Sequence, residues 1–509
     1  MKKISLLILV LIFAVNLFAC SNAAGGAPNK GEDYDAMYPN GVMGDALEGE
    51  LDQSSPNYNY EEVRENGFIT TEVNPNSTFS LDRNTASYSI SRKIINGGSK
   101  LPKDSVRIEE FVNYFTYGYE RPQGDQKLAL GGSLSYCPWN LENYLFTVNL
   151  TAPEISFENA KQNNFVFLID VSGSMTGMDR LGLIQQAFVM LAENLADNDI
   201  VSIVTYASGT RVAAEGLLGS QKAEIIGVLQ DLTAGGSTNG AGGIQLAYDT
   251  AQKYFIEGGN NRIILATDGD FNVGIANKNQ LYEFISEKRD LGVWLSVLGV
   301  GMYNTNDTIM KTLAENGNGN YGYIDTVDEA KRLLVTEMGG TLNTIAKDVK
   351  INVEFKAEVV KKYRLIGYET KMMSTEDFED EAKDAGEIGS GHMVTAVYEL
   401  VLEDGGAGAF ATAEVRFKDP ETNEQMSVVQ NYATEDLLYV QPQSEDTVFI
   451  GCVVEFGLLV RESEYKAQAS FDNIVERLEM LSCVVGENAD SFKSEFLELV
   501  KKARVIYQS

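Results

Sequence analysis

Histidine is almost absent from this chain of 509 residues, which contains His392 alone. A single imidazole excludes zinc sites built from several histidines and leaves one candidate base for a serine nucleophile. His392 stands in a glycine-rich segment before an apolar run, with no G-x-S-x-G elbow nearby. We therefore interpret His392 as a structural residue and predict that the protein is not an enzyme.

Cysteine is scarce as well: the chain has four, at positions Cys20, Cys137, Cys452 and Cys483. They form neither a C-x-x-C pair nor a Cys/His zinc pattern. If Cys20 is used elsewhere, the other three allow at most one disulfide, and the sequence does not select among the three pairings. We expect buried free thiols, because a chain of this size has ample core without covalent cross-links.

Basic residues are few relative to acidic ones, 41 against 73, which gives a formal net charge of -32. Nucleic acids and anionic lipid headgroups require clusters of Lys and Arg, so we exclude nucleic acid as a partner. The acidity is interpreted as a solubility feature. A partner carboxylate must then be held by local geometry, which charge screening over about 8 Å makes feasible.

The amino terminus contains an apolar segment that is too short to favour a transmembrane helix. Lys2 and Lys3 precede the apolar run 4–19, as in a signal peptide spanning residues 1–19. Leu17–Cys20 resembles a bacterial lipobox, which implies lipidation of Cys20. Residues 20–60 are polar and lack an apolar period, so they predict a flexible tether. We expect a membrane-anchored envelope protein at the outer membrane or cell surface, with the periplasmic face as the alternative.

The middle of the chain alternates strands and helices. Residues 200–206, 262–267 and 293–299 are continuous apolar runs, typical of strands buried on both faces. Between two of the strands, apolar residues recur at helical spacing, at Ile184, Ala187, Phe188, Leu191 and Leu195. This alternation predicts a doubly wound, mostly parallel α/β sheet over residues 161–343.

Three polar loops follow strands of that sheet. The apolar strand 164–169 ends in Asp170, Ser172 and Ser174. Gly235–Thr238 forms a second loop, and Thr267–Asp270 follows the apolar run 263–266. Loops of this kind meet in the crevice beyond the carboxyl ends of the strands. Hydroxyl and carboxylate oxygens are hard ligands, so the pattern predicts a site for Mg²⁺, or for Mn²⁺ or Ca²⁺.

These loops resemble the metal-ion-dependent adhesion site (MIDAS) of the von Willebrand factor type A domain. Asp170, Ser172 and Ser174 match its D-x-S-x-S motif, Thr238 matches the family's threonine, and Asp268 its third-loop aspartate. The resemblance implies that the three hydroxyls bind the ion while the aspartates act directly or through water. One position would remain for an Asp or Glu carboxylate of a protein partner. The alternative is that the loops hold no metal.

Residues from about 68 to 505 are similar to bacterial YfbK-type von Willebrand A lipoproteins. The matching motifs are Ser77–Asp82, Thr85–Tyr88, Val106–Glu110, Asn113–Phe115, Cys137–Asn140, Gly389–His392 and Tyr398–Glu399. Asn84 departs from the family pattern, which more often has an acidic residue there. The resemblance implies an architecture more than an activity.

Strand patterns lie on both sides of the A domain. Residues 145–150 precede it, and Val349–Phe355, 363–368, 393–402 and 411–417 follow it with a period near two. We predict that the N-terminal region 61–160 and the segment 344–443 form one discontinuous β-sandwich into which the A domain is inserted.

The last part of the chain, residues 444–509, has a helical period. Its apolar stripes contain Val448, Phe449, Cys452 and Phe456, then Phe492, Phe496, Val500 and Ala503. We expect these helices to pack on the sandwich.

Together these features predict a non-enzymatic envelope lipoprotein that mediates metal-dependent protein interaction or adhesion. One alternative is an envelope assembly or stress-complex component that uses the A domain as a scaffold. Another is a hydrolase that uses the ion as a Lewis acid, for which the sequence offers only acidic bases such as Asp270.

Overall fold

The computed structural model describes most of the chain from residue 60 onward. The described residues are 60, 62–81, 83–155, 161–269, 278–301, 306–337, 340, 343–381, 383, 385–438 and 443–508. The expected signal peptide, tether and Cys20, and also Asp270, lie outside them. Within the described part, no helix combines the length and the apolar content needed to cross a membrane.

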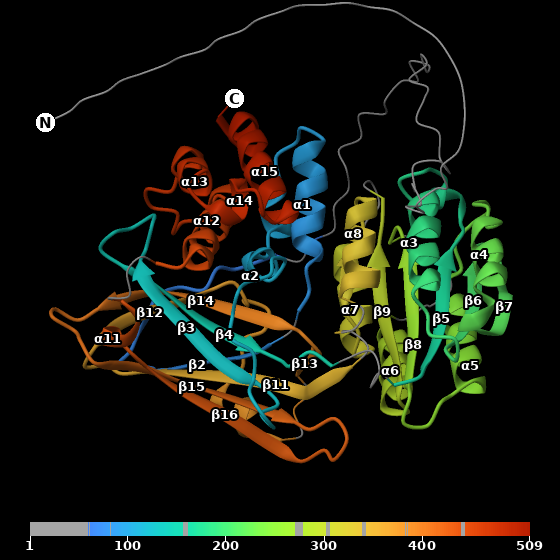
Figure 1. Cartoon of the computed structure of the whole chain (residues 1–509), viewed down its shortest axis with the longest axis horizontal. Helices are drawn as coiled ribbons and strands as arrows, with labels where there is room; N and C mark the ends of the chain where they lie inside the picture. The colour runs from blue at the N-terminus through green and yellow to red at the C-terminus, as the bar shows by residue number, and fades with distance from the viewer. Residues whose placement is uncertain are drawn as a thin grey trace, which may run out of the picture. The chain divides into compact units, whose positions relative to one another are not determined.

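The A domain contains a six-stranded sheet with the order β10-β9-β8-β5-β6-β7 (Figure 1). Its strands are β5 (Asn163–Asp170), β6 (Ile200–Tyr206), β7 (Thr210–Leu218), β8 (Asn260–Thr267), β9 (Val293–Gly299) and β10 (Tyr321–Tyr323). Five of them run parallel, and β7 is antiparallel to β6. The predicted mostly parallel sheet is confirmed, and β7 is an antiparallel edge strand that the sequence pattern did not reveal.

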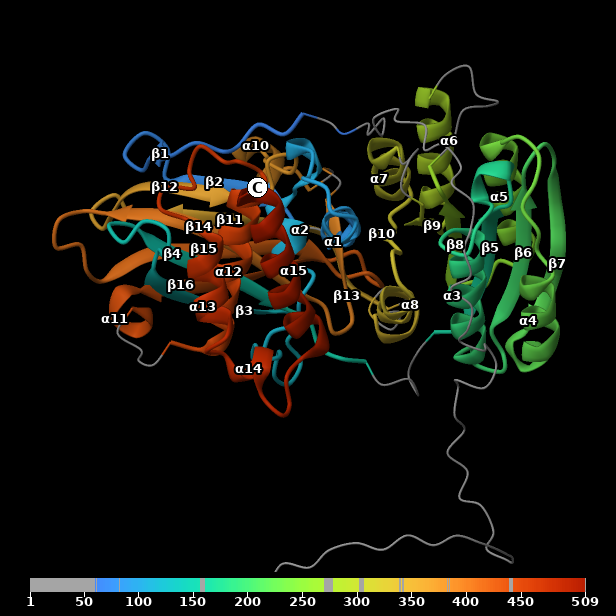
Figure 2. The same cartoon turned by 90° about the horizontal axis from the view of Figure 1, so that it is seen from above.

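Helices cover both faces of this sheet. One face carries α5 (Gly240–Lys253), α6 (Lys278–Asp290) and α7 (Asp307–Asn316), and the other carries α3 (Leu181–Glu193), α4 (Lys222–Gln230) and α8 (Val327–Lys331) (Figure 2). Strand β5 shows why: Phe165 and Phe167 point to the α3 side, while Val166 packs on the α5 side. A strand with apolar residues on both faces needs helices on both, so the domain is doubly wound.

The β-sandwich is assembled from both sides of the A domain. One sheet contains β1 (Ile69–Thr70), β12 (Val360–Ile366), β14 (Met393–Leu402), β4 (Tyr144–Thr151) and β3 (Ala129–Tyr136). The second contains β13 (Gly386–Gly389), β11 (Thr344–Phe355), β15 (Ala409–Lys418) and β16 (Gln425–Ala433), with β2 (Asn76–Ser80) paired to β11. The two sheets share one apolar core, in which Phe146 of β4 packs on Phe410 of β15. The predicted discontinuous sandwich with an inserted A domain is confirmed.

A helical layer covers the sheet that contains β14. It consists of α1 (Ala86–Asn96), α2 (Ile108–Val112), α12 (Glu445–Val460), α13 (Phe471–Leu478), α14 (Ser482–Val485) and α15 (Ser491–Gln508). Phe115 packs on Phe449 of α12 and on Phe496 of α15, and the same core reaches Val397 of β14. The expected packing of the C-terminal helices on the sandwich is confirmed. Cys137, Cys452 and Cys483 are free thiols.

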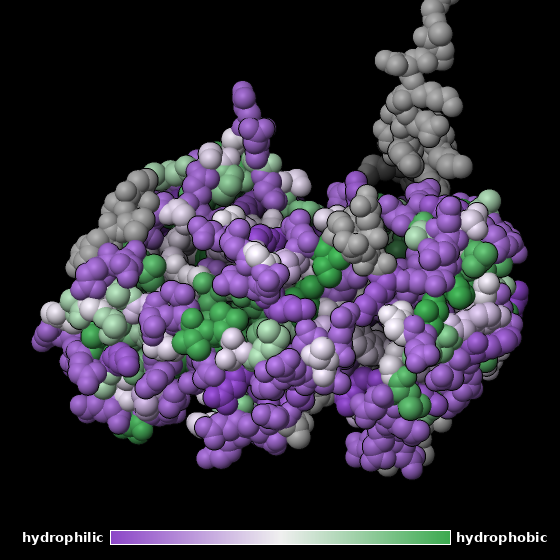
Figure 3. Space-filling view, turned by 60° about the horizontal axis from the view of Figure 1, so that its bottom comes forward, coloured by the Kyte–Doolittle hydropathy of each residue, from purple (hydrophilic) through white to green (hydrophobic). Residues whose placement is uncertain are grey.

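The molecular surface agrees with the acidic composition. The face in Figure 3 is mostly hydrophilic, with hydrophobic residues gathered in small groups over the sandwich and the A domain. Surface apolar groups of this size are ordinary in folded proteins.

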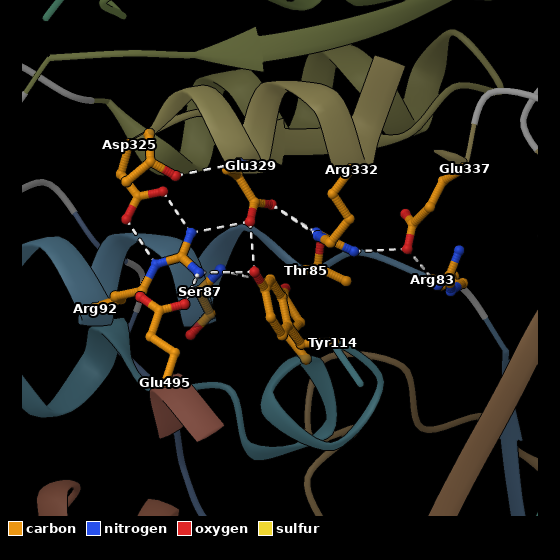
Figure 4. A network of polar contacts seen from close by, with 12 residues as sticks. Arg83, Thr85, Ser87, Arg92, Tyr114, Asp325, Glu329, Arg332, Glu337 and Glu495 are labelled. Carbon is orange, nitrogen blue, oxygen red and sulfur yellow. Dashed lines mark hydrogen bonds and ion pairs between the residues drawn. The ribbon is translucent and has the colours of Figure 1, made fainter. Parts of the chain in front are cut away.

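A buried network of charges joins the A domain to the helical layer (Figure 4). At its centre Glu329 of α8 accepts hydrogen bonds from Arg92 of α1 at 2.9 Å and from Tyr114 at 2.5 Å. On the other side, Arg332 of the π-helical turn η6 (Arg332–Thr336) donates to Glu329 at 2.6 Å. The inserted domain is thus held by directional contacts as well as by its two chain connections.

The network continues at both ends. Arg92 also pairs with Asp325 at 2.5 Å and with Glu495 of α15 at 3.0 Å. Glu337 accepts from Arg332 at 2.6 Å and from Arg83 at 2.7 Å. Each buried charge therefore has a partner of opposite sign, which is the condition under which buried ions are tolerated.

Candidate metal centre

The first loop leaves the carboxyl end of β5, and its aspartate is fixed by hydrogen bonds. Asp170 is fully buried; its Oδ1 accepts from the Ser172 backbone N–H at 2.9 Å, and its Oδ2 accepts from the Thr267 hydroxyl at 3.1 Å. The hydroxyl oxygens of Ser172 and Ser174 lie 3.0 Å apart. The loop therefore presents a carboxylate and two hydroxyls in one small volume.

The second loop is attached to the first through backbone hydrogen bonds. Gly173 N–H donates to the Gly236 carbonyl at 2.9 Å, and Gly235 N–H donates to the Val171 carbonyl at 2.8 Å. Thr238 is buried on this loop, just before α5 begins. The attachment places the Gly235–Thr238 loop beside the Asp170 loop.

Glycine is required at position 236. Its φ of +86° is in the left-handed region, and a Cβ there would come within 2.6 Å of the Ser208 hydroxyl oxygen. That same oxygen accepts a hydrogen bond from Ser237 N–H at 2.9 Å. The loop therefore packs closely on the segment after β6.

The third loop follows β8. Asp268 is buried, and the preceding Thr267 hydroxyl accepts from Gly269 N–H at 3.1 Å while donating to Asp170. Gly301, after β9, lies against both Asp268 and Arg180: a Cβ at Gly301 would be 3.3 Å from the Asp268 Cβ and from the Arg180 Nε. Arg180 in turn donates to the Ser174 carbonyl. The three loops thus meet at the edge of the sheet that is formed by the carboxyl ends of its parallel strands, as the parallel strand order requires.

The electrostatics of this edge favour a cation. Burial and, to a smaller extent, the nearby charge of Asp268 raise the pKa of the Asp170 carboxyl to about 6, against the opposing effect of the Ser172 hydrogen bonds. Burial also raises the pKa of Tyr206, whose hydroxyl lies in the field of Asp170. A divalent ion would offset both the dehydration of Asp170 and its repulsion by Asp268.

The donor chemistry fits a hard ion. The described residues contain no group of three or more His, Cys, Asp and Glu side chains placed to hold a metal. Ion binding at this edge would therefore depend on hydroxyl oxygens beside the two aspartates, which is a donor set for Mg²⁺, Mn²⁺ or Ca²⁺. The role of the five residues as ligands stays a prediction.

The structure adds residues that the sequence did not single out. Thr267 bonds directly to Asp170, and its only sequence signal was a hydroxyl at the end of a strand, next to Asp268. Arg180 supports the first loop through the Ser174 carbonyl, and no local pattern predicts this. His392 lies elsewhere, in the sandwich segment between β13 and β14, where its Nδ1 accepts from Gly389 N–H at 3.0 Å.

Comparison with known proteins agrees with this architecture. Residues 165–270 match the family described as von Willebrand factor type A domain, and residues 54–147 match one described as von Willebrand factor. Residues 340–410 and 405–506 match the family described as "Uncharacterized protein YfbK, C-terminal". The chain is 37% identical over 470 residues to "Uncharacterized protein YfbK" of Escherichia coli K12, covering 87% of this chain and 80% of that protein.

Two solved structures are similar at low identity. A von Willebrand factor type A protein from Catenulispora acidiphila is 14% identical with a TM-score of 0.42, covering 75% of this chain and 96% of that one. The ArnB paralog VWA2 from Sulfolobus acidocaldarius is 15% identical with a TM-score of 0.36, covering 75% and 99%.

Fold and family matches together define a von Willebrand factor type A domain protein. Within that class, the chain belongs to the YfbK family, because the similarity to the Escherichia coli protein extends over the flanking regions as well as the A domain. The description of that relative assigns no activity.

Proposed function

We propose that this chain is a cell-envelope lipoprotein that binds a protein ligand through a divalent ion, Mg²⁺ or else Mn²⁺ or Ca²⁺. The observation that carries the proposal is the hydrogen-bonded convergence of three loops on one sheet edge, with two buried carboxylates and three hydroxyls. The residues proposed to hold the ion are Asp170, Ser172, Ser174, Thr238 and Asp268.

The protein's own contribution is to position the donors. Ser172 N–H and the Thr267 hydroxyl hold both oxygens of Asp170, so this carboxylate is oriented before any ion arrives. When bound, the ion would supply a positive centre that accepts a carboxylate oxygen from the partner. Without such a centre, an acidic ligand would meet two buried carboxylates on a protein of net charge -32.

The envelope location is part of the proposal. Lys2 and Lys3, the apolar run 4–19 and the Leu17–Cys20 lipobox support lipidation of Cys20. A lipid anchor with more than one acyl chain gives durable attachment, and the polar segment after Cys20 would hold the folded part away from the membrane. We place the protein at the outer membrane or cell surface.

A binding role fits the site better than hydrolysis. A hydrolase needs a general base near the ion, and among the described residues this edge contributes hydroxyls, Asp170, Asp268 and the phenol of Tyr206. Both aspartates already belong to the proposed ligand set. A scaffold role in an envelope complex would use the same domain without depending on the ion, so chelation distinguishes it.

The test is capture of partners from envelope extract with the mature chain as bait, in Mg²⁺ and in EDTA. We expect a partner that is retained in Mg²⁺, released by EDTA and recovered when Mg²⁺ is restored. Ser172→Ala and Thr238→Ala should lose it, whereas Ser427→Ala, an exposed serine on β16, should retain it. Binding that survives EDTA and both site variants would place the interface elsewhere and overturn the proposal.

A partner identified in this way allows a sharper test. Neutralising its bridging Asp or Glu should weaken binding, and a double-mutant cycle with Thr238→Ala should show coupling, because both changes remove one shared contact. If the two losses of binding free energy are additive, Thr238 does not take part in the contact with that carboxylate.

A further inference from the structure

A cavity of about 470 Å³ lies at the junction of the A domain, the sandwich and the helical layer. Arg83, Arg121 and His392 supply polar groups to its lining, and Phe115, Met393 and Phe492 supply apolar ones. Its volume falls within the range of about 300–1,000 Å³ that is typical of small-molecule sites, which often form at domain junctions. None of the proposed metal ligands lines it.

His392 brings a buried hydrogen-bond donor to this cavity. The side chain is 5% exposed, and its Nδ1 accepts a hydrogen bond from Gly389 N–H at 3.0 Å. In a neutral imidazole the proton then sits on Nε2. Nε2 is buried and has no hydrogen-bond acceptor among the described residues. The sole histidine of the chain therefore presents an N–H that has no partner in the described part of the structure.

Arg83 brings a second such donor. Its side chain is 9% exposed, and Nη2 pairs with Glu337 at 2.7 Å at one end of the buried network (Figure 4). Nε is buried and has no acceptor in the described part of the chain. The positive charges of Arg83 and Arg121, after burial, help to lower the pKa of His392, so both guanidinium groups lie close to a neutral imidazole.

The acidic groups of the lining are already engaged. Glu337 accepts from Arg83 and Arg332, and Glu154 pairs with Arg121 at 3.1 Å. Asp490 accepts from the backbone N–H of Phe492 at 2.8 Å at the start of α15. Among the described residues they leave Arg83 Nε and His392 Nε2 without acceptors, and a buried donor without an acceptor destabilises the folded protein. A ligand acceptor would remove that destabilisation.

The remaining walls select the rest of the ligand. The rings of Phe115 and Phe492 and the side chain of Met393 offer apolar contact beside the two donors. The lining's three arginines are balanced by Glu154, Glu337 and Asp490, so a singly charged anion is better matched than a dianionic phosphate in a protein of net charge -32. Two donors also match the two oxygens of one carboxylate.

We propose that this cavity binds a small monocarboxylate with an aromatic or branched aliphatic body, whose carboxylate accepts hydrogen bonds from Arg83 Nε and His392 Nε2. The apolar body packs against Phe115, Met393 and Phe492. The carboxylate belongs either to a free organic acid or to the terminus of a short peptide. This site is separate from the metal edge, and its occupancy does not require the ion.

The test is calorimetric titration of the mature chain with 3-phenylpropionate and with its neutral amide, each in Mg²⁺ and in EDTA. We expect saturable binding of the acid, at least tenfold weaker binding of the amide, and no effect of EDTA. Acetyl-Gly-Phe with a free carboxylate, compared with its amide, identifies the source of the carboxylate. If this peptide binds more tightly than 3-phenylpropionate, the site is assigned to peptide termini. If it binds more weakly, the site is assigned to free acids.

Variants connect the binding to the two donors. His392→Phe keeps the ring volume and removes the donor, and Arg83→Gln removes the charge; each should weaken 3-phenylpropionate at least tenfold. Arg64→Gln, an exposed arginine paired with Glu62 at 3.5 Å, is the matched control and should bind as wild type. Arg83→Gln also breaks the ion pair with Glu337. If that variant does not fold, His392→Phe alone decides the test. Equal binding of acid and amide, unchanged binding by His392→Phe, or no saturable binding of 3-phenylpropionate, phenylacetate or 4-methylvalerate would overturn the proposal.

Discussion

Glu329→Gln is the most informative single change at the junction of the A domain and the helical layer. Glu329 is 0% exposed and lies between Arg92 at 2.9 Å and Arg332 at 2.6 Å, with the Tyr114 hydroxyl at 2.5 Å. The substitution keeps the volume of the side chain and removes its charge. Two buried guanidinium groups would then face a neutral amide. Asp325 would still pair with Arg92, and Glu337 would still pair with Arg332.

Two independent arguments give the size of the effect. Burial alone would raise the pKa of Glu329, but the charges of Arg332 and Arg92 outweigh it and lower the pKa from 4.5 to about 2. At about 1.4 kcal/mol per pKa unit, this depression corresponds to about 3 kcal/mol of folding stability. Removing one partner of a buried ion pair costs about 3–5 kcal/mol in other proteins. We therefore expect Glu329→Gln to lower the unfolding free energy by about 3 kcal/mol at pH 7.

The pH dependence has a fixed direction. Because the folded pKa of Glu329 is below its unfolded value, its stabilisation is fully present above pH 4.5 and is lost as the pH falls through about 2. The difference between wild type and variant should therefore shrink in acid.

Urea unfolding at pH 7 and at pH 3 measures both effects. Glu315→Gln is the control, because Glu315 forms a more exposed pair with Lys371 at 2.6 Å and should cost less than about 1 kcal/mol. A Glu329→Gln variant as stable as Glu315→Gln at pH 7 would refute the reasoning that the junction depends on this charge.

Three further predictions concern separate regions. Burial raises the pKa of Glu109 to about 7, so its ionisation destabilises the folded state as the pH rises from 4.5 through about 7. In urea unfolding, Glu109→Gln should raise the free energy of unfolding by about 1–3 kcal/mol at pH 8 and change it little at pH 4. An equal effect at both pH values would contradict this prediction. Cys20→Ala should abolish incorporation of a fatty-acid analogue in growing cells, and undiminished label would disprove lipidation at this residue. Gly236→Ala should lower the thermal midpoint and weaken Mg²⁺ binding, because the added Cβ would lie 2.6 Å from the Ser208 hydroxyl oxygen. Gly209→Ala is the control, because a Cβ there has no neighbour within 4 Å. Identical behaviour of the two variants would argue against a strained second loop.

The sequence predicted the strands best where they are buried on both faces. The apolar runs 200–206 and 293–299 coincide with β6 and β9, because burial of every side chain leaves a continuous apolar signal. The segment 393–402, which was predicted from a period near two, also coincides with β14. β7 gave no such signal: it is a half-exposed edge strand, interrupted by Gly216 at a φ of +63°. Edge strands carry less of the core and therefore less of the pattern.

The candidate site was only partly predictable for a related reason. Loops after parallel strands meet at one edge, so the sequence alone groups Asp170, Thr238 and Asp268. The hydrogen bond from Thr267 to Asp170 depends on the direction of one side chain at a strand end. Side-chain direction at that level is set by packing and not by spacing along the chain.

The network of charges at the junction could not be predicted from local sequence patterns. Arg92 and Glu329 are 237 positions apart, and each stands in a helix whose sequence gives no sign of a distant partner. The pairing requires the A domain to be already placed against α1 and α15. The cavity at Arg83 and His392 has the same origin, since its lining comes from six separate segments of the chain that meet only in the folded protein.

The most direct measurement of the proposed metal-dependent binding is calorimetric titration of Mg²⁺ into the metal-stripped mature chain, paired with the thermal midpoint at saturation. We predict one saturable site per chain and a raised midpoint, because an ion that binds only the folded loops stabilises them by mass action. Asp170→Ala and Ser172→Ala should remove both effects, and Ser427→Ala should keep them. No saturable heat, or a shift that persists unchanged in Asp170→Ala, would contradict a metal centre at this edge of the sheet.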